Sequence, residues 1–154
     1  MDSIIDLTST NYSYYTIPAA FALCMIPSMY AAGLAGRNYD IANPRNMLDT
    51  CAKDDKLDKV VARRINRAKG ASANGFETIG LYAAAVVAAN SARVDLVKLN
   101  KLTIGYILSR LVYNFVYIHL QDNRRFAGLR PLVWGAGIYV IIALFLAAGS
   151  ALNA

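Results

Sequence analysis

The stretch Leu7–Gly36, LTSTNYSYYTIPAAFALCMIPSMYAAGLAG, contains no aspartate, glutamate, lysine or arginine over thirty residues. A second stretch, Pro131–Ala154, PLVWGAGIYVIIALFLAAGSALNA, is uncharged over twenty-four residues. A membrane-spanning helix needs roughly 20 predominantly apolar residues, so both stretches are long enough. Of the 154 residues, 56% are hydrophobic and only 17% are charged, whereas a soluble domain has about 25% charged residues. These features predict an integral membrane protein.

Two further apolar stretches lie between these ends, and together they predict an all-α fold. The connectors 93–101 and 121–130 are short, which makes neighbouring helices antiparallel. The connector 37–69 is long and charged. We therefore predict a four-helix bundle that forms a single domain over residues 1–154. The predicted spans cover residues 14–35, 70–92, 102–120 and 131–151.

Lysine and arginine are distributed unequally among the connectors. Nine lie in the connector 37–69 and three in 121–130, against three in 93–101 and none in the two terminal segments. Because basic residues flank spans on the cytosolic side, we expect the long connector in the cytosol and both termini on the other side. The polar stretch 49–59 is expected to be a solvated loop.

The sequence also excludes several classes of site. The two cysteines, Cys24 and Cys51, are too few for a disulfide scaffold or a zinc site. A single histidine, His119, excludes a multi-histidine metal centre, and no phosphate-binding or hydrolase motif is present. With so few cysteines and histidines we expect no metal site. The net charge of +6 comes from basic connectors between apolar runs, so we do not expect nucleic-acid binding either.

Polar side chains share two helical faces, and ionisable groups at membrane depth usually have a partner or a function. The predicted topology places both faces in the cytosolic half of the bundle, beside Arg124, Arg125, Arg130 and Trp134. One face of the span 102–120 carries Arg110, Tyr113, Asn114, Tyr117 and Gln121. One face of the span 70–92, with the residues before it, carries Arg63, Arg67, Gly70, Asn74 and Glu77.

These faces have more than one interpretation. A buried Arg110–Glu77 ion pair would only fix the helix register. However, one arginine neutralises one carboxylate, and the faces also gather tyrosines, amides and further basic groups, which suits an anionic ligand with carboxylates. Neither face carries a nucleophilic side chain, so in a reaction at this site the ligand would supply the nucleophile. A channel would need a polar stripe across the whole bilayer, whereas this stripe stops near Arg110 and leaves the other half apolar.

The chain resembles the MAPEG family, the membrane-associated proteins in eicosanoid and glutathione metabolism, from Asn43-Pro44-Arg45 through the last span. Residues 67–77, RAKGASANGFE, are similar to the family's arginine-rich stretch that ends in Asn-x-x-Glu. Residues 110–117, RLVYNFVY, match the family pattern Arg-x-x-(His/Tyr)-x-x-x-Tyr. The two patterns occur in the expected order on four predicted spans.

The resemblance implies a homotrimer in the endoplasmic reticulum or another intracellular membrane, with glutathione bound between subunits near the cytosolic side. It also implies that an arginine just after the third span stabilises the glutathione thiolate. Arg124 fits by its distance from Tyr117 and Arg130 by its place before the fourth span, and the sequence leaves both open. A fixed cation lowers the pKa of a thiol, ordinarily about 8.5. The implied glutathione ligands are Arg67, Asn74, Glu77, Arg110, Tyr113 and Tyr117.

Two positions depart from the family pattern. Catalytic members carry arginines where this chain has Gly70 and, in some cases, Ala73. The first interpretation is nevertheless a glutathione-dependent membrane transferase or peroxidase that acts on lipophilic electrophiles. The alternative is a non-enzymatic, lipid-binding accessory protein of the same fold. A protein that only presents lipids need not retain Arg110 with both tyrosines, which favours the enzyme.

Overall fold

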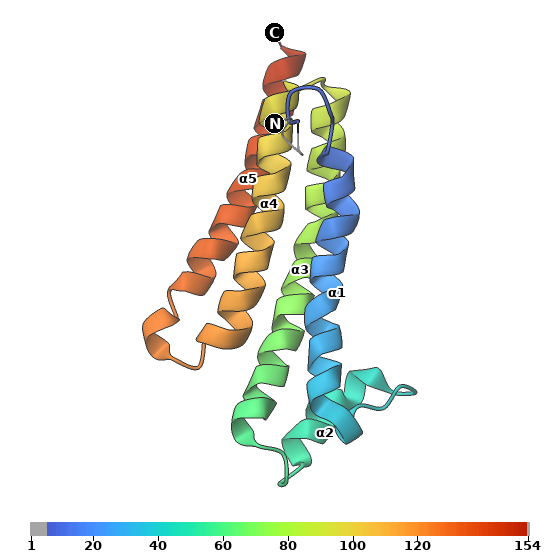
Figure 1. Cartoon of the computed structure of the whole chain (residues 1–154), viewed down its shortest axis with the longest axis vertical. Helices are drawn as coiled ribbons and strands as arrows, with labels where there is room; N and C mark the ends of the chain where they lie inside the picture. Colours follow the sequence, from blue (N-terminus) through green and yellow to red (C-terminus); the bar gives the residue numbers. More distant parts are fainter. Residues whose placement is uncertain (1–5, 154) are drawn as a thin grey trace.

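The computed structural model describes residues 6–153, which form helices and no strand (Figure 1). Short 3-10 turns lie at Gly36–Asn38, Pro44–Asn46 and Arg124–Phe126, and a π-helical turn, Val116–Leu120, continues the helix before it. The all-α prediction is thereby confirmed. The α-helices of the described chain are α1 (Ser13–Ala35), α2 (Met47–Lys53), α3 (Lys59–Ser91), α4 (Leu96–Phe115) and α5 (Leu129–Leu152).

The four long helices pack mainly in two pairs. Helix α1 lies along α3 and α4 lies along α5, and α3 also contacts α5. Figure 1 shows the start of α1 and the end of α5 at the same end of the molecule. Toward the opposite end the α1–α3 pair and the α4–α5 pair separate, and that end carries α2 and the connector between α4 and α5 (Figure 1).

The bounds of α1 and α5 lie within two residues of the predicted spans, whereas α3 and α4 begin earlier than predicted. Helix α3 starts at Lys59 because the Asp58 carboxylate accepts hydrogen bonds from the backbone amides of Val60 and Val61, at 2.7 and 3.1 Å. Asp95 likewise accepts from the amide of Lys98 at 2.9 Å and starts α4. Such N-caps satisfy amides that have no partner within the helix, and they set the helix starts outside the apolar runs.

The stretch 49–59 is only partly the solvated loop that we expected. Helix α2 occupies its first part, and Met47 and Cys51, one turn apart, are buried against the rest of the fold. Burial raises the pKa of the Cys51 thiol above its ordinary value, and the nearby Asp54 charge adds to the effect. The prediction was wrong here because two apolar residues on one face are too few to reveal a short helix.

The half of the molecule in which α1 begins and α5 ends is also less apolar than expected. Asn100 is buried, accepts a hydrogen bond from the Tyr12 amide at 2.9 Å, and donates to the Leu7 and Thr10 carbonyls. Tyr82 stacks on Tyr106 with 3.7 Å between ring centroids. The polar stripe therefore does not stop at Arg110. Its members in this half are bonded to one another and to backbone, as buried polar groups generally are.

Two segments of the described chain are long and apolar enough to cross a membrane. They are Ser13–Asn38, with a mean hydropathy of 1.6, and Arg124–Leu152, with 2.2. Helices α3 and α4 do not meet the same criterion, because small and polar residues dilute their apolar faces. Two such segments favour association with a membrane.

Candidate functional site

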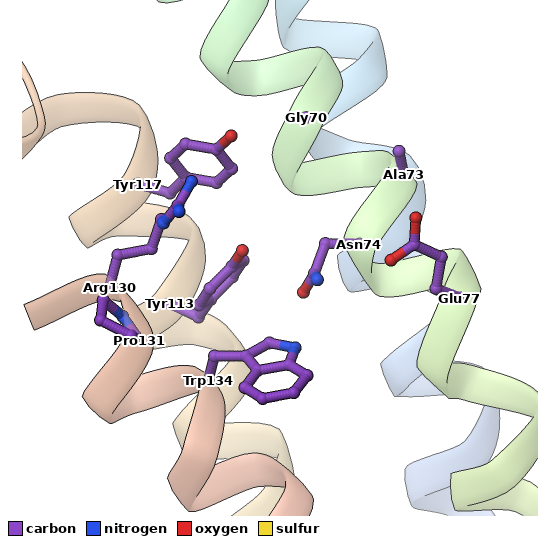
Figure 2. A pocket seen from close by; sticks show the side chains of 9 residues that line it. All are labelled: Gly70, Ala73, Asn74, Glu77, Tyr113, Tyr117, Arg130, Pro131 and Trp134. Carbon is purple, nitrogen blue, oxygen red and sulfur yellow. The ribbon is translucent and has the colours of Figure 1, made fainter.

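A pocket of about 440 Å³ lies between α3 on one side and α4 and α5 on the other (Figure 2). Helix α3 presents four residues, spaced so that Gly70, Asn74 and Glu77 share one face. Tyr113 of α4 and Tyr117 of the π-turn face them, and α5 supplies the remainder. The lining residues are Gly70, Ala73, Asn74, Glu77, Tyr113, Tyr117, Arg130, Pro131 and Trp134.

Arg110 lies behind this lining and is only 5% exposed. Its Nη2 donates to Oδ1 of Asn74 at 3.1 Å, and its Cζ lies 4.4 Å from the centroid of the Tyr113 ring. A buried cation needs such compensation. Among the described residues Arg110 makes no ion pair with Glu77, so the register-fixing pair is not formed. Arg110 instead holds Asn74, whose side chain extends across the pocket in Figure 2.

Tyr117 packs directly against the backbone of α3 at Gly70. A Cβ atom placed on Gly70 would lie 2.8 Å from the Tyr117 hydroxyl and 3.3 Å from two ring carbons. Cζ of Arg130 lies 4.8 Å from the centroid of the same ring, and Figure 2 shows the guanidinium over the ring. The absence of a side chain at Gly70 is therefore what allows the Tyr117 phenol to reach α3.

Arg67 does not line the pocket, although the sequence proposed it as a ligand. Its Nη1 and Nη2 donate to the two carboxylate oxygens of Asp122 at 2.7 and 2.8 Å, and its Nε donates to the Ile118 carbonyl at 3.1 Å. Arg63 adds a 3.2 Å contact to the same carboxylate. Hydrogen bonds from Arg67, followed by those from Arg63, hold the pKa of the Asp122 carboxyl at about 2, below its ordinary value of 3.8.

The two candidate thiolate partners lie in different surroundings. Arg130, in the first turn of α5, lines the pocket beside Tyr117. Arg124 lies in the exposed turn Arg124–Phe126 and is not among the lining residues. The sequence analysis did not predict Pro131 as a lining residue, and it placed Trp134 at the same depth as the polar faces without giving it a place in the site. The i, i+4 spacing of Arg130 and Trp134 on a helix is the signal that would have placed both on one wall.

The charges of the pocket are few. Among its described lining residues, Glu77 is the one carboxylate and Arg130 the one cation. Glu77 is exposed at the pocket wall, and Gly70 and Ala73 leave the α3 wall without an arginine. The pocket thus offers one fixed cation, one carboxylate, an amide and two phenols, a set that suits a ligand carrying both signs of charge.

The sequence was also compared with known families and proteins. The family model described as "MAPEG family" matches residues 14–150, which include most of α1 and α5 and all of α3 and α4. The comparisons with curated proteins and with solved structures gave no match. The match extends over far more than half of the chain and includes every residue that lines the pocket. The chain therefore belongs to the MAPEG family.

Proposed function

We propose that this protein is a glutathione-dependent membrane enzyme, a transferase or peroxidase that acts on lipophilic electrophiles. Membership of the MAPEG family supports a membrane protein related to glutathione and eicosanoid metabolism. The observation that carries the finer proposal is the pocket between α3 and the α4–α5 pair. It gathers Asn74, Glu77, Tyr113, Tyr117 and Arg130 around one space.

Glutathione carries two carboxylates, one ammonium group and a thiol, and the lining has groups for each. Glu77 is suited to the ammonium group, because opposite charges at close range attract. Asn74, held by Arg110, and the phenols of Tyr113 and Tyr117 can donate or accept hydrogen bonds. In this proposal Arg130 lies beside the sulfur.

Arg130 is the proposed activating residue. The thiol releases its proton to solvent, and the nearby guanidinium stabilises the thiolate that remains. In the transferase reaction the thiolate forms a bond to an electrophilic carbon while a leaving group departs with the bonding electrons. In the peroxidase reaction it attacks the terminal oxygen of a lipid hydroperoxide, which releases an alcohol after protonation. A second glutathione then converts the resulting sulfenic acid to disulfide and water.

The proposal extends to assembly and location. We propose a homotrimer with glutathione between subunits, because the pocket of one chain is an open groove and Trp134, a large apolar residue of its lining, is exposed. We further propose four membrane spans in the endoplasmic reticulum or another intracellular membrane, with the pocket toward the cytosol. The unequal distribution of basic residues supports that orientation.

One observation favours the alternative, a lipid-binding accessory protein of the same fold. The α3 wall carries Gly70 and Ala73 where catalytic members of the family carry arginines, so it contributes no cation to an anionic ligand. A hydrogen bond to a charged group contributes about 1.5–3 kcal/mol. The loss of such a bond would weaken glutathione binding without removing the cation beside the sulfur, so binding of glutathione and ionisation of its thiol have to be measured separately.

The test is a titration of the purified protein with glutathione near neutral pH, followed by ultraviolet difference absorption. If Arg130 stabilises the sulfur, bound glutathione gives a thiolate band. Arg130→Leu should abolish the band and leave much of the affinity, because the other contacts remain. Arg124→Leu, which removes an arginine outside the pocket, should leave both the band and the affinity unchanged.

Arg110→Leu tests a residue that positions a ligand contact, for comparison with Arg130→Leu. It removes the donor that holds Asn74 and should weaken glutathione binding more than it changes the band of the bound form. Binding by the wild-type protein without any band would support the accessory protein. No glutathione binding at all would overturn the enzyme proposal, and a band that survives Arg130→Leu would overturn the role of Arg130.

A further inference from the structure

Arg67 and Asp122 form a closely bonded pair between α3 and the end of the π-turn. All three kinds of guanidinium nitrogen in Arg67 are engaged, two with the carboxylate and Nε with the Ile118 carbonyl. The Arg67 side chain is only 12% exposed. Bidentate arginine–carboxylate pairs are among the stronger and more directional hydrogen-bonded contacts. Arg67 is thus largely unavailable to a ligand.

The backbone that Arg67 holds is the backbone next to Tyr117. The last carbonyls of a helix lack partners within the helix, and Arg67 supplies one for Ile118, the residue directly after Tyr117. A π-turn is an unusual local form that is often associated with functional sites. Here it continues α4 through Val116–Leu120, so a contact at Ile118 restrains the direction in which Tyr117 leaves the helix.

The same face of α3 also receives the Tyr117 ring. Gly70 lies three residues after Arg67, which is about one helical turn. Arg67 therefore restrains the Tyr117 backbone, and one turn later Gly70 leaves room for its hydroxyl. Arg130 covers the face of the ring. Tyr117 is held from three directions, and its phenol lines the pocket.

We infer that Arg67 and Asp122 are positioning residues that direct Tyr117 into the pocket, and that Arg67 is not a cation of the ligand site. The expected effect of the Arg67–Asp122 pair on glutathione binding rests on the proposed function. Its expected effect on the position of Tyr117 does not. Hydrogen bonds from Arg67 and Arg63 keep the pKa of Asp122 at about 2, so the pair stays ionised throughout the physiological pH range.

The variant Asp122→Ala separates this inference from a ligand role for Arg67. If Arg67 were a ligand cation, removal of its carboxylate partner would free it and glutathione would bind more tightly. If Arg67 positions Tyr117, the same variant removes its partner and glutathione should bind more weakly, by about two- to tenfold, as expected for the loss of one hydrogen bond. The two roles thus predict opposite signs.

A matched control exists in the same chain. Arg37 and Asp54 form a second arginine–aspartate pair, in which Nη2 of Arg37 donates to both carboxylate oxygens at 3.1 and 3.0 Å, and neither residue lines the pocket between α3 and α5. Asp54→Ala should leave the dissociation constant of glutathione unchanged. The single tryptophan of the chain, Trp134, lines the pocket, so its fluorescence provides the binding signal for all variants.

The coupling to Tyr117 is tested with a double-mutant cycle. Tyr117→Phe removes the hydroxyl, so Asp122→Ala added to it should cost clearly less affinity than in the wild-type background. Additive losses would mean that Asp122 acts on the ligand by another route and would overturn the inference. Should Asp122→Ala fold poorly, Asp122→Asn keeps the shape of the side chain and removes the charge, and it should show the same sign with a smaller effect.

A measurement without glutathione completes the test. In protein labelled with 3-fluorotyrosine, the ¹⁹F resonance of Tyr117, assigned from Tyr117→Phe, should shift in Asp122→Ala and Arg67→Ala but not in Asp54→Ala. An unchanged Tyr117 resonance, or tighter glutathione binding in Asp122→Ala, would overturn the inference. A shifted resonance in a protein that binds no glutathione would support the positioning role, while the proposed function alone would fail.

Discussion

The arginines of this chain show how strongly the role of a residue depends on its surroundings. Arg67 is engaged by Asp122 and a carbonyl, Arg110 is buried behind the pocket, Arg124 lies on an exposed turn, and Arg130 lines the pocket over a tyrosine ring. Because the interaction between charges falls with distance, Arg130, which lines the pocket, is the arginine of the four that the proposed function assigns to the thiol.

Gly70→Ala separates binding from stability. The added Cβ would lie 2.8 Å from the Tyr117 hydroxyl, and the three nearest atoms all belong to that side chain, so the ring has to leave its present position while the helix backbone stays in place. Alanine also favours a helix over glycine by about 1 kcal/mol. We expect the melting temperature in detergent to stay the same or rise, while the dissociation constant of glutathione increases about two- to tenfold.

The corresponding control is Gly80→Ala, also in α3, where an added Cβ meets nothing within 4 Å. It should bring the same gain in helix stability and no change in glutathione affinity. Unchanged binding by Gly70→Ala would show that the position of the Tyr117 hydroxyl does not matter to the ligand.

The contact between α1 and α3 depends on small residues at one crossing point. A Cβ on Gly75 would lie 2.7 Å from Sγ and 3.3 Å from Cα of Cys24. Close by, the Ser72 hydroxyl donates to the Cys24 carbonyl at 2.8 Å. Small residues permit such close approach of membrane helices, and this crossing fixes α3, and with it Asn74, relative to α1.

Gly75→Ala should therefore destabilise the protein. Here the added atom meets backbone as well as the thiol, and overpacking of this kind costs about 1–3 kcal/mol, which outweighs the gain of about 1 kcal/mol in helix propensity. Unfolding in a denaturing detergent, followed by Trp134 fluorescence, would measure the loss. Adding Cys24→Ala removes the nearest atom and should restore part of the stability, and no loss in Gly75→Ala would argue against a close α1–α3 crossing.

The whole molecule has an asymmetry that agrees with the proposed orientation. Helix α3 has 33 residues and is about 50 Å long at 1.5 Å per residue, whereas the hydrocarbon core is about 30 Å thick. Its first turns carry Arg63, Arg64 and Arg67 and lie at the end of the molecule that also carries α2 (Figure 1). That end is suited to the membrane surface and the cytosol.

Cysteine labelling tests the orientation. Cys24 and Cys51 are both buried, so the native chain provides a weakly reactive background, contrary to what the polar sequence around Cys51 suggested. In sealed vesicles with the cytosolic side outward, Asp55→Cys should react with an impermeant thiol reagent and Ser9→Cys should react only after the membrane is opened. Both positions are exposed in the fold. The reverse pattern would overturn the orientation and the cytosolic location of the pocket.

Much of the fold follows from local properties of the sequence. The uncharged runs at both ends predicted α1 and α5 to within two residues, because apolar content and the lack of charge act along each helix separately. The patterns at residues 67–77 and 110–117 were sufficient for the family resemblance, and the match to residues 14–150 confirms it. The starts of α3 and α4 and the short helix α2 were missed, since single capping residues and two apolar positions carry a weak signal.

The pocket depends on contacts that no local pattern contains. Periodicity placed Arg67, Gly70 and Asn74 on one face of a helix, but it could not show that Arg67 would meet Asp122, 55 residues away in the chain. Nor could spacing show that Arg130 lines the pocket and Arg124 does not. Both outcomes depend on the rotation and offset of α3 against the π-turn and α5, which close packing at points such as Gly70 and Tyr117 determines. Periodicity specifies the face of a helix, whereas packing between helices specifies which side chains on that face meet.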